Sequence, residues 1–173
     1  MDNQLVQRMI GAAKLDVRTY EEVEHDTSAT QQALIVVILA SIAGGIGALD
    51  DGGIALIGGV IGGVVQWAVL AFVCYFVGTR LLGTAETNAD WGQLARTLGF
   101  AYTPAILGIL GFIPVVEWIV ALVVFVWVIA TTIVAIRQAL DFSTGRAVAT
   151  AIISSIVSGL AIGIVYAIFG IGF

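Results

Sequence analysis

The stretch Ile54–Thr79, IALIGGVIGGVVQWAVLAFVCYFVGT, contains no acidic, basic or histidine side chain. An α-helix needs about 20 residues to cross the hydrocarbon core of a bilayer, and this stretch exceeds that length. The composition of the whole chain agrees, because 60% of its 173 residues are hydrophobic, 11% are charged, and the mean hydropathy is +1.06. A soluble domain of this size would have too little polar surface. The sequence therefore predicts an integral membrane protein.

Four further stretches also lack charged and histidine side chains, and with a few flanking residues each approaches or exceeds the length of a span. They are Ile35–Leu49, Leu98–Val116, Trp118–Ile136 and Ala147–Phe173. The predicted fold is all-α, a polytopic bundle of five transmembrane helices. Their expected bounds are residues 31–49, 54–79, 93–113, 115–138 and 146–171.

The basic residues predict the orientation of this bundle. Cytoplasmic loops of membrane proteins carry an excess of Lys and Arg, whereas acidic residues contribute little to topology. All seven basic residues fall in the N-terminal segment, between the second and third spans, or between the fourth and fifth. They are Arg8, Lys14, Arg18, Arg80, Arg96, Arg137 and Arg146. We expect a cytoplasmic N-terminus, with Asp50, Asp51, Glu117 and the C-terminal Phe173 on the extracytoplasmic side.

Two domains follow from these bounds. Residues 31–173 form the predicted five-helix transmembrane domain, and residues 1–30 form a cytoplasmic N-terminal segment with a short amphipathic helix. In that segment Leu5, Met9 and Ala13 recur at helical spacing. The helix either lies in the membrane interface or packs on the protein's own cytoplasmic face, and the pattern favours neither.

The glycines of the second span predict close helix packing. Gly58 with Gly62, and Gly59 with Gly63, are overlapping pairs of small residues four apart, which let another helix approach the backbone. A phosphate-binding loop would need a Lys followed by Ser or Thr after its last glycine, and none is present. The last span repeats the pattern at Ser155, Gly159 and Gly163. Packing within the chain is the favoured interpretation, and contact with a partner or a second copy is the alternative.

The third span contains Pro104, which removes one backbone hydrogen bond and predicts a kink that leaves the Phe100 carbonyl without its usual donor. A structural bend is the simpler interpretation. The alternative is a lipid or partner groove lined by Tyr102. In the loops on the side of the N-terminus, the candidate partner or lipid contacts are Trp91, Arg96, Ser143 and Arg146. The arginines would equally serve to fix the orientation and bind headgroups non-specifically.

The residues of catalysis and metal binding are too few and too scattered. One histidine, His25, and one cysteine, Cys74, cannot make a metal site, and a single cysteine excludes an intrachain disulfide. No acidic or basic residue lies in the middle of a span, as proton or ion relays require. The net charge of −5 argues against a nucleic acid partner. We expect no catalytic residue, no cofactor and no metal, and hence no enzyme.

Four segments together resemble the prokaryotic branch of the Yip-one (Ypt-interacting protein) domain family. They are LDVRTYEEVEHDTSATQQA before and into the first span, GTRLLGTAET after the second, RTLGFAYTPAILGILGFIP in the third, and ALDFSTGRAVATAI between the last two. The resemblance implies five transmembrane helices, a cytoplasmic N-terminus, and a place in the cytoplasmic membrane of a prokaryote. Eukaryotic members are associated with Rab-type GTPases and vesicle traffic. The family supplies no catalytic residue.

The sequence thus favours a non-enzymatic integral membrane scaffold or accessory subunit of a membrane protein complex, which packs against other membrane proteins or organises lipid. The alternative is a small transporter of lipid or another apolar molecule. The expected partners are membrane lipids and other integral membrane proteins or a second copy of the chain, and no nucleic acid.

Overall fold

The computed structural model describes residues 3–47, 53–84, 87–113 and 115–169, and within these ranges it contains helices and no strand. Asp50, Asp51 and Phe173, on which part of the predicted orientation depends, lie outside them. The α-helices are α1 (Asn3–Ala13), α2 (Val17–His25), α3 (Ala29–Gly47), α4 (Gly53–Phe76), α5 (Trp91–Ala101), α6 (Glu117–Ala139) and α7 (Thr144–Phe169). A π-helical turn, η2 (Val77–Leu81), extends α4, and a 3₁₀ helix, η3 (Thr103–Phe112), follows α5.

Among the described residues, five helical segments are long and apolar enough to cross a membrane, in agreement with the predicted number. They are Ala29–Ile46, Leu56–Leu81, Trp91–Phe112, Glu117–Ala139 and Thr144–Val165. The helix ends differ from the predicted ones by a few residues, as expected for boundaries inferred from sequence.

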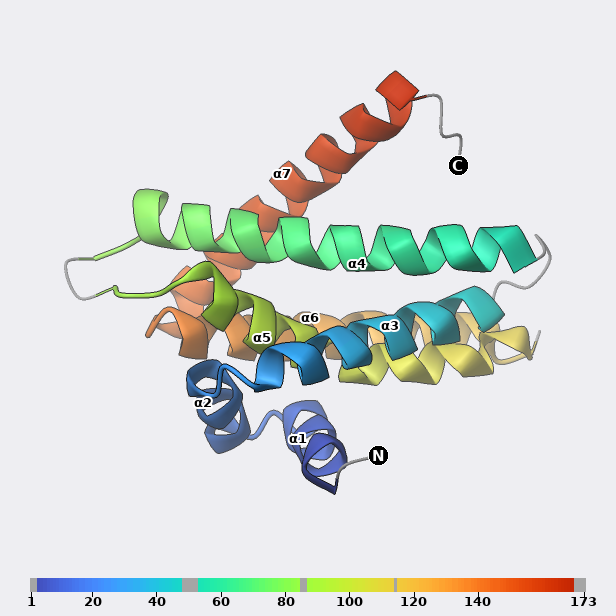
Figure 1. The fold of residues 1–173 in the computed structure, drawn as a ribbon, viewed down its shortest axis with the longest axis horizontal. Helices are drawn as coiled ribbons and strands as arrows, with labels where there is room; N and C mark the ends of the chain where they lie inside the picture. The colour runs from blue at the N-terminus through green and yellow to red at the C-terminus, as the bar shows by residue number, and fades with distance from the viewer. Residues whose placement is uncertain (1–2, 48–52, 85–86, 114, 170–173) are drawn as a thin grey trace.

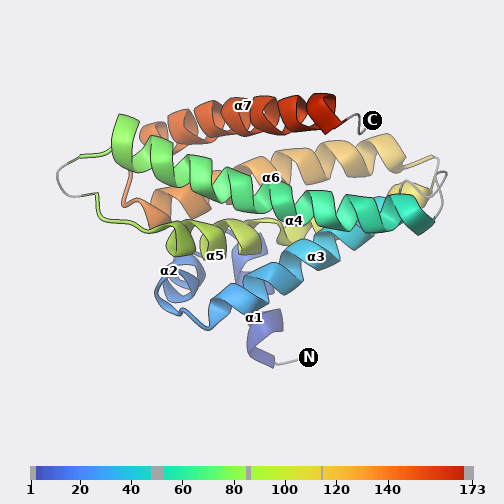
Figure 2. The ribbon, with the colours of Figure 1, turned by 45° about the horizontal axis from the view of Figure 1, so that its top comes forward.

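The helices form a bundle with α7 on one side and the pair α1 and α2 on the opposite side (Figures 1 and 2). Helix α3 packs most extensively on η3, and α4 packs on α3, α5 and α7. Helix α7 contacts α4 and α6 near its start and then turns away from α4 (Figure 1). Its buried side chains, Ala147, Thr150, Ser154 and Ser158, recur every three or four residues along one face. Most of its remaining surface is therefore uncovered by the chain itself.

Helices α3 and α5 approach each other closely. Gly99 on α5 faces Ala33 on α3 so closely that a Cβ atom added to Gly99 would lie 2.7 Å from the Ala33 Cβ and 3.2 Å from its Cα. Leu94, Leu98 and Phe100 are fully buried around this contact. Small residues at the crossing thus bring two backbones together, as membrane helices require.

The third span changes its helix type where the sequence predicted a kink. Helix α5 begins with a capping box, in which the Gln93 N–H donates to Asp90 Oδ1 at 2.8 Å and the Asp90 N–H donates to Gln93 Oε1 at 2.7 Å. It ends at Ala101, and the chain continues past Pro104 as a 3₁₀ helix. The Phe100 carbonyl, expected to lack a donor, accepts a hydrogen bond from the Thr103 hydroxyl at 2.7 Å.

The N-terminal segment contains two helices where the sequence predicted one. Leu15 has a φ of 62°, which interrupts the helix, and Asp16 caps the start of α2. Both helices pack on α5 and α6, and Tyr20 and Val23 of α2 are fully buried. Of the two alternatives for this segment, packing on the protein's own surface is the one that the structure contains.

Candidate functional site

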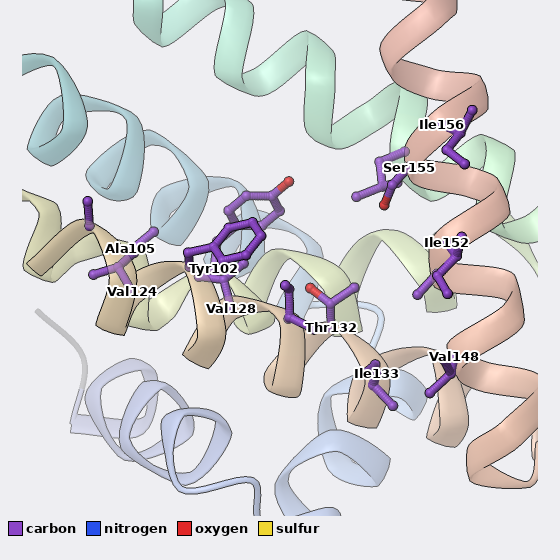
Figure 3. Close-up of a pocket in the computed structure, with 15 residues that line it drawn as sticks. Tyr102, Ala105, Val124, Val128, Thr132, Ile133, Val148, Ile152, Ser155 and Ile156 are labelled. Atoms are coloured by element: carbon purple, nitrogen blue, oxygen red, sulfur yellow. The ribbon is translucent and has the colours of Figure 1, made fainter. Parts of the chain in front are cut away.

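A groove of about 780 Å³ lies between α6 and α7, with the end of α5, the start of η3 and one residue of α4 at its base. Helices α6 and α7 are close together at Ile133 and Val148 and separate towards Val124 and Ile156 (Figure 3). The lining is almost entirely apolar and comes from α4, η3, α6 and α7, with Tyr102 between α5 and η3. It consists of Leu70, Tyr102, Ala105, Ala121, Val124, Phe125, Val128, Ile129, Thr132, Ile133, Val148, Ala151, Ile152, Ser155 and Ile156.

The short connection between α6 and α7 explains the wedge shape. The chain reverses at Asp141, which has a φ of 52°, so the two helices start from one point and diverge. The Leu140 side chain packs against the backbone of Gly78 in η2. A Cβ added at Gly78 would lie 2.4 Å from Leu140 Cδ1, so only glycine leaves room for this contact. The reversal is thereby fixed against the end of α4, and the divergence leaves the groove between apolar faces.

Three hydroxyl groups interrupt the apolar lining. They belong to Tyr102 at the end of α5, Thr132 on α6 and Ser155 on α7. The side chain of Tyr102 points into the space between α6 and α7 (Figure 3). Within the described part of the chain, none of the three makes a side-chain hydrogen bond, and the lining contains no Asp, Glu, Lys, Arg or His. The groove is therefore suited to a neutral, hydrophobic ligand.

A groove lined by Tyr102 beside the bend was the alternative to a simple structural bend, and Tyr102 is one of the residues in this lining. Pro104 is buried and is not part of the lining. Thr132 was missed, although the adjacent threonines 131 and 132 in an apolar span mark a polar point on two faces of α6. Only the position of α7 decides which of the two hydroxyls faces the groove.

Apart from Arg96, the predicted contact residues of the loops are exposed. Trp91 is exposed and donates to the Ala68 carbonyl at 3.4 Å, and Ser143 and Arg146 are exposed at the start of α7. The Arg146 guanidinium lies over the Phe142 ring, 5.9 Å from its centre.

Arg96 requires a correction, because it is on helix α5 and 6% exposed. Its guanidinium donates to the backbone carbonyls of Val23, at 3.0 Å, and Glu24 at the end of α2. A cation at a helix C-terminus satisfies carbonyls that lack partners and opposes the helix dipole. Arg96 is thus an internal anchor for α2 and is not exposed to an external partner.

The glycine motifs also need correction. Of the residues predicted to pack within the chain, Gly63 faces another helix, where an added Cβ would meet the Ser41 hydroxyl of α3. At Gly58, Gly59, Gly159 and Gly163 an added Cβ would have no described atom of a neighbouring element within 4 Å. Ser155 is exposed and lines the groove. Packing within the chain therefore fails at these four glycines, because α4 and α7 turn these faces outward.

Electrostatic contacts concentrate on the opposite side of the bundle, at α1 and α2. Arg8 is 3% exposed and binds Glu22 at 2.7 Å and Asp26 at 2.6 Å, with Gln32 accepting at 2.8 Å. The hydrogen bond from the Ser28 hydroxyl, followed by the one from Arg8, lowers the pKa of Asp26 to about 2. Among the described residues, no group of three His, Cys, Asp or Glu side chains could hold a metal ion.

The apolar spans and the uncharged groove define the class as an α-helical membrane protein with an apolar groove. The family model described as Yip1 domain matches residues 17–166, and the chain belongs to the Yip1 domain family. Comparison with curated proteins and with solved structures found no match.

Proposed function

We propose that this protein is a non-enzymatic integral membrane scaffold that organises lipid by holding a hydrophobic chain in the groove between α6 and α7. The observation that carries this proposal is the groove itself, about 780 Å³ with an apolar lining built from candidate spans. Ligand sites of this size and composition bind drug-sized molecules. The proposed location is the cytoplasmic membrane of a prokaryote, where lipid surrounds the open side of the groove.

A second candidate, an accessory subunit of a membrane protein complex, is favoured by the outward-facing glycines. Gly58 and Gly59 on α4 and Gly159 and Gly163 on α7 leave open backbone on two helices. Such faces are suited to a helix of another membrane protein or of a second copy. Transport of an apolar molecule is a third reading, because the same groove would hold a molecule in transit.

Filling the groove tests the proposal. Ile152 lines the groove and is 56% exposed, so the larger side chain of Ile152→Trp has room to enter the groove without unfolding the bundle. We expect this variant to lose the lipid that co-purifies with the wild-type protein in mild detergent, measured by mass spectrometry of the intact complex. Val157→Trp, on the same helix but outside the lining, is the matched control and keeps the lipid. Equal lipid retention in both variants would show that the groove is not the binding site.

A further inference from the structure

The three hydroxyls of the groove identify the chemistry of its ligand, if the groove binds lipid as proposed above. We infer that the groove binds a neutral lipid of the quinone class, whose ring carbonyl oxygens accept hydrogen bonds from Tyr102, Thr132 and Ser155. The inference concerns binding alone and includes no electron transfer.

The hydroxyls are unusual because they lack the partner that helices normally give to threonine and serine. The buried Ser154 hydroxyl also lacks a hydrogen-bond partner, but several other threonine and serine hydroxyls of this chain donate to the carbonyl four residues earlier, at distances of 2.7 to 3.0 Å. The examples are Ser41, Thr79, Thr131 and Thr150. Thr132 and Ser155 make no such bond among the described residues. A hydroxyl in an apolar environment without an acceptor is unfavourable, so a ligand that supplies acceptors is favoured.

The positions of the hydroxyls favour a ring over an extended chain. Tyr102, Thr132 and Ser155 come from three elements that surround the groove, α5, α6 and α7 (Figure 3). A quinone ring carries carbonyl oxygens on opposite edges and can therefore use donors from more than one side. The aromatic rings of Tyr102 and Phe125 in the lining offer flat apolar faces to such a ring. A saturated chain would leave all three hydroxyls without an acceptor.

The position of the hydroxyls along the helices and the absence of charge in the lining restrict the chemical class of the ligand further. Thr132 lies seven residues before the end of α6 at Ala139, and Ser155 lies eleven residues after the start of α7 at Thr144. At 1.5 Å per residue these distances are about 10 and 16 Å along the helices. A polar group bound at Thr132 and Ser155 would therefore lie along the two helices, away from the end where α6 and α7 are connected. No basic side chain lines the groove, so nothing would balance the charge of a carboxylate or phosphate.

The experiment compares two probes that differ in their carbonyl groups. Decylubiquinone and decylbenzene are titrated against the purified protein in phosphatidylcholine nanodiscs. We expect decylubiquinone to bind more tightly, and Thr132→Val to weaken its binding roughly three- to tenfold, as for the loss of one hydrogen bond. Thr132→Ser keeps the hydroxyl and should keep the affinity. Decylbenzene binding should be the same in all variants.

Thr131→Val is the matched control. The Thr131 hydroxyl donates to the Ala101 carbonyl at 2.7 Å and does not line the groove. Its loss should reduce thermal stability and leave the affinity for decylubiquinone unchanged. Tyr102→Phe gives an independent variant, since it removes a hydroxyl and keeps the ring.

Each contrary outcome overturns a different statement. If both probes bind equally and Thr132→Val has no effect, the hydrogen-bonding site is overturned while the lipid groove stands. If dioleoylglycerol binds more tightly than decylubiquinone, the quinone class is overturned in favour of an ester lipid. If neither probe binds and Ile152→Trp keeps its lipid, the proposed function fails as well.

Discussion

Single residues fix the N-terminal helices to the bundle. Arg96 donates to the last carbonyls of α2, and Gln93 Nε2 donates to the Glu24 carboxylate at 3.0 Å. On the other side of α2, Arg8 is held by Glu22 and Asp26. Buried charges need hydrogen-bond partners, and Arg8 and Arg96 each have several. The stability of α2 therefore depends on a few polar contacts.

Glu24 makes the attachment of α2 sensitive to pH. Burial raises the pKa of the Glu24 carboxyl to about 7 from its ordinary 4.5, and the nearby Asp141 contributes in the same direction. The folded state therefore holds this proton more tightly than the unfolded state. The resulting stability is fully present below pH 4.5 and is lost as the pH rises through about 7. We expect the unfolding temperature in detergent to decrease as the pH is raised from 4.5 to above about 7.

The matched variant is Glu24→Gln, which keeps the hydrogen bond with Gln93 and cannot ionise. Its unfolding temperature should change less than that of the wild-type protein between pH 5 and pH 7.5. Identical pH profiles for the two proteins would exclude Glu24 as the responsible group.

At the scale of elements, small residues allow the closest approach between helices. A side chain larger than hydrogen has no space at Gly99 against the Ala33 backbone, whereas Gly59 has open space around it. We expect Gly99→Leu to separate α3 from α5 and to destabilise the protein by at least about 1 to 3 kcal/mol, the usual cost of overpacking. Unfolding in detergent measures this loss.

Gly59→Leu is the control, because its hydropathy change is the same and its position is exposed. It should leave the unfolding of the purified chain unchanged. If it also changes the size of the detergent complex, the α4 glycines contact a second copy. Equal destabilisation by the two substitutions would contradict the packing described for α4.

The five spans were largely predictable from the sequence, because each is a continuous stretch without charged side chains, and such a stretch can be identified from the local sequence alone. The capping box at Asp90 was predictable for the same reason. The role of Arg96 was not, because its partners on α2 lie 72 and 73 residues away. The glycine motifs were misleading because small residues permit close packing on any face, and the sequence does not specify which face meets a neighbour.

At the scale of the whole molecule, one end of the bundle carries unpaired positive charge. Arg80, Arg137 and Arg146 lie at the ends of η2, α6 and α7 that meet near Leu140, and none forms an ion pair with a described carboxylate. Positive loops remain on the cytoplasmic side during insertion. We therefore predict that this end is cytoplasmic and that the opposite end, with Glu117, is extracytoplasmic.

Cysteine labelling tests this orientation. The native Cys74 is fully buried and contributes little background. In intact cells, an impermeant thiol reagent added outside should label Trp118→Cys and should not label Thr144→Cys, although both positions are exposed. The reverse pattern would overturn the orientation, and labelling of both would contradict an α6 that crosses the membrane.

The groove could be predicted only in part. Pro104 and Tyr102 indicated an irregular place in the third span, and the structure has the α to 3₁₀ transition there. The volume of the groove depends on the angle between α6 and α7, which is set by the reversal at Asp141 and by the contact of Leu140 with Gly78. Such an angle results from contacts between distant segments and leaves no local pattern in the sequence.

The bond between Trp127 and α1 has a consequence for the order of assembly. The indole N–H of Trp127 donates to the Ala13 carbonyl at 2.7 Å, across 114 residues of sequence. At a synthesis rate of about 5 to 20 residues per second, the ribosome needs roughly 6 to 23 seconds to make that interval. The segment that is translated first therefore settles late, after α6 has emerged. Until then, the Ala13 carbonyl lacks its indole donor, and the packing of α1 against α6 is incomplete.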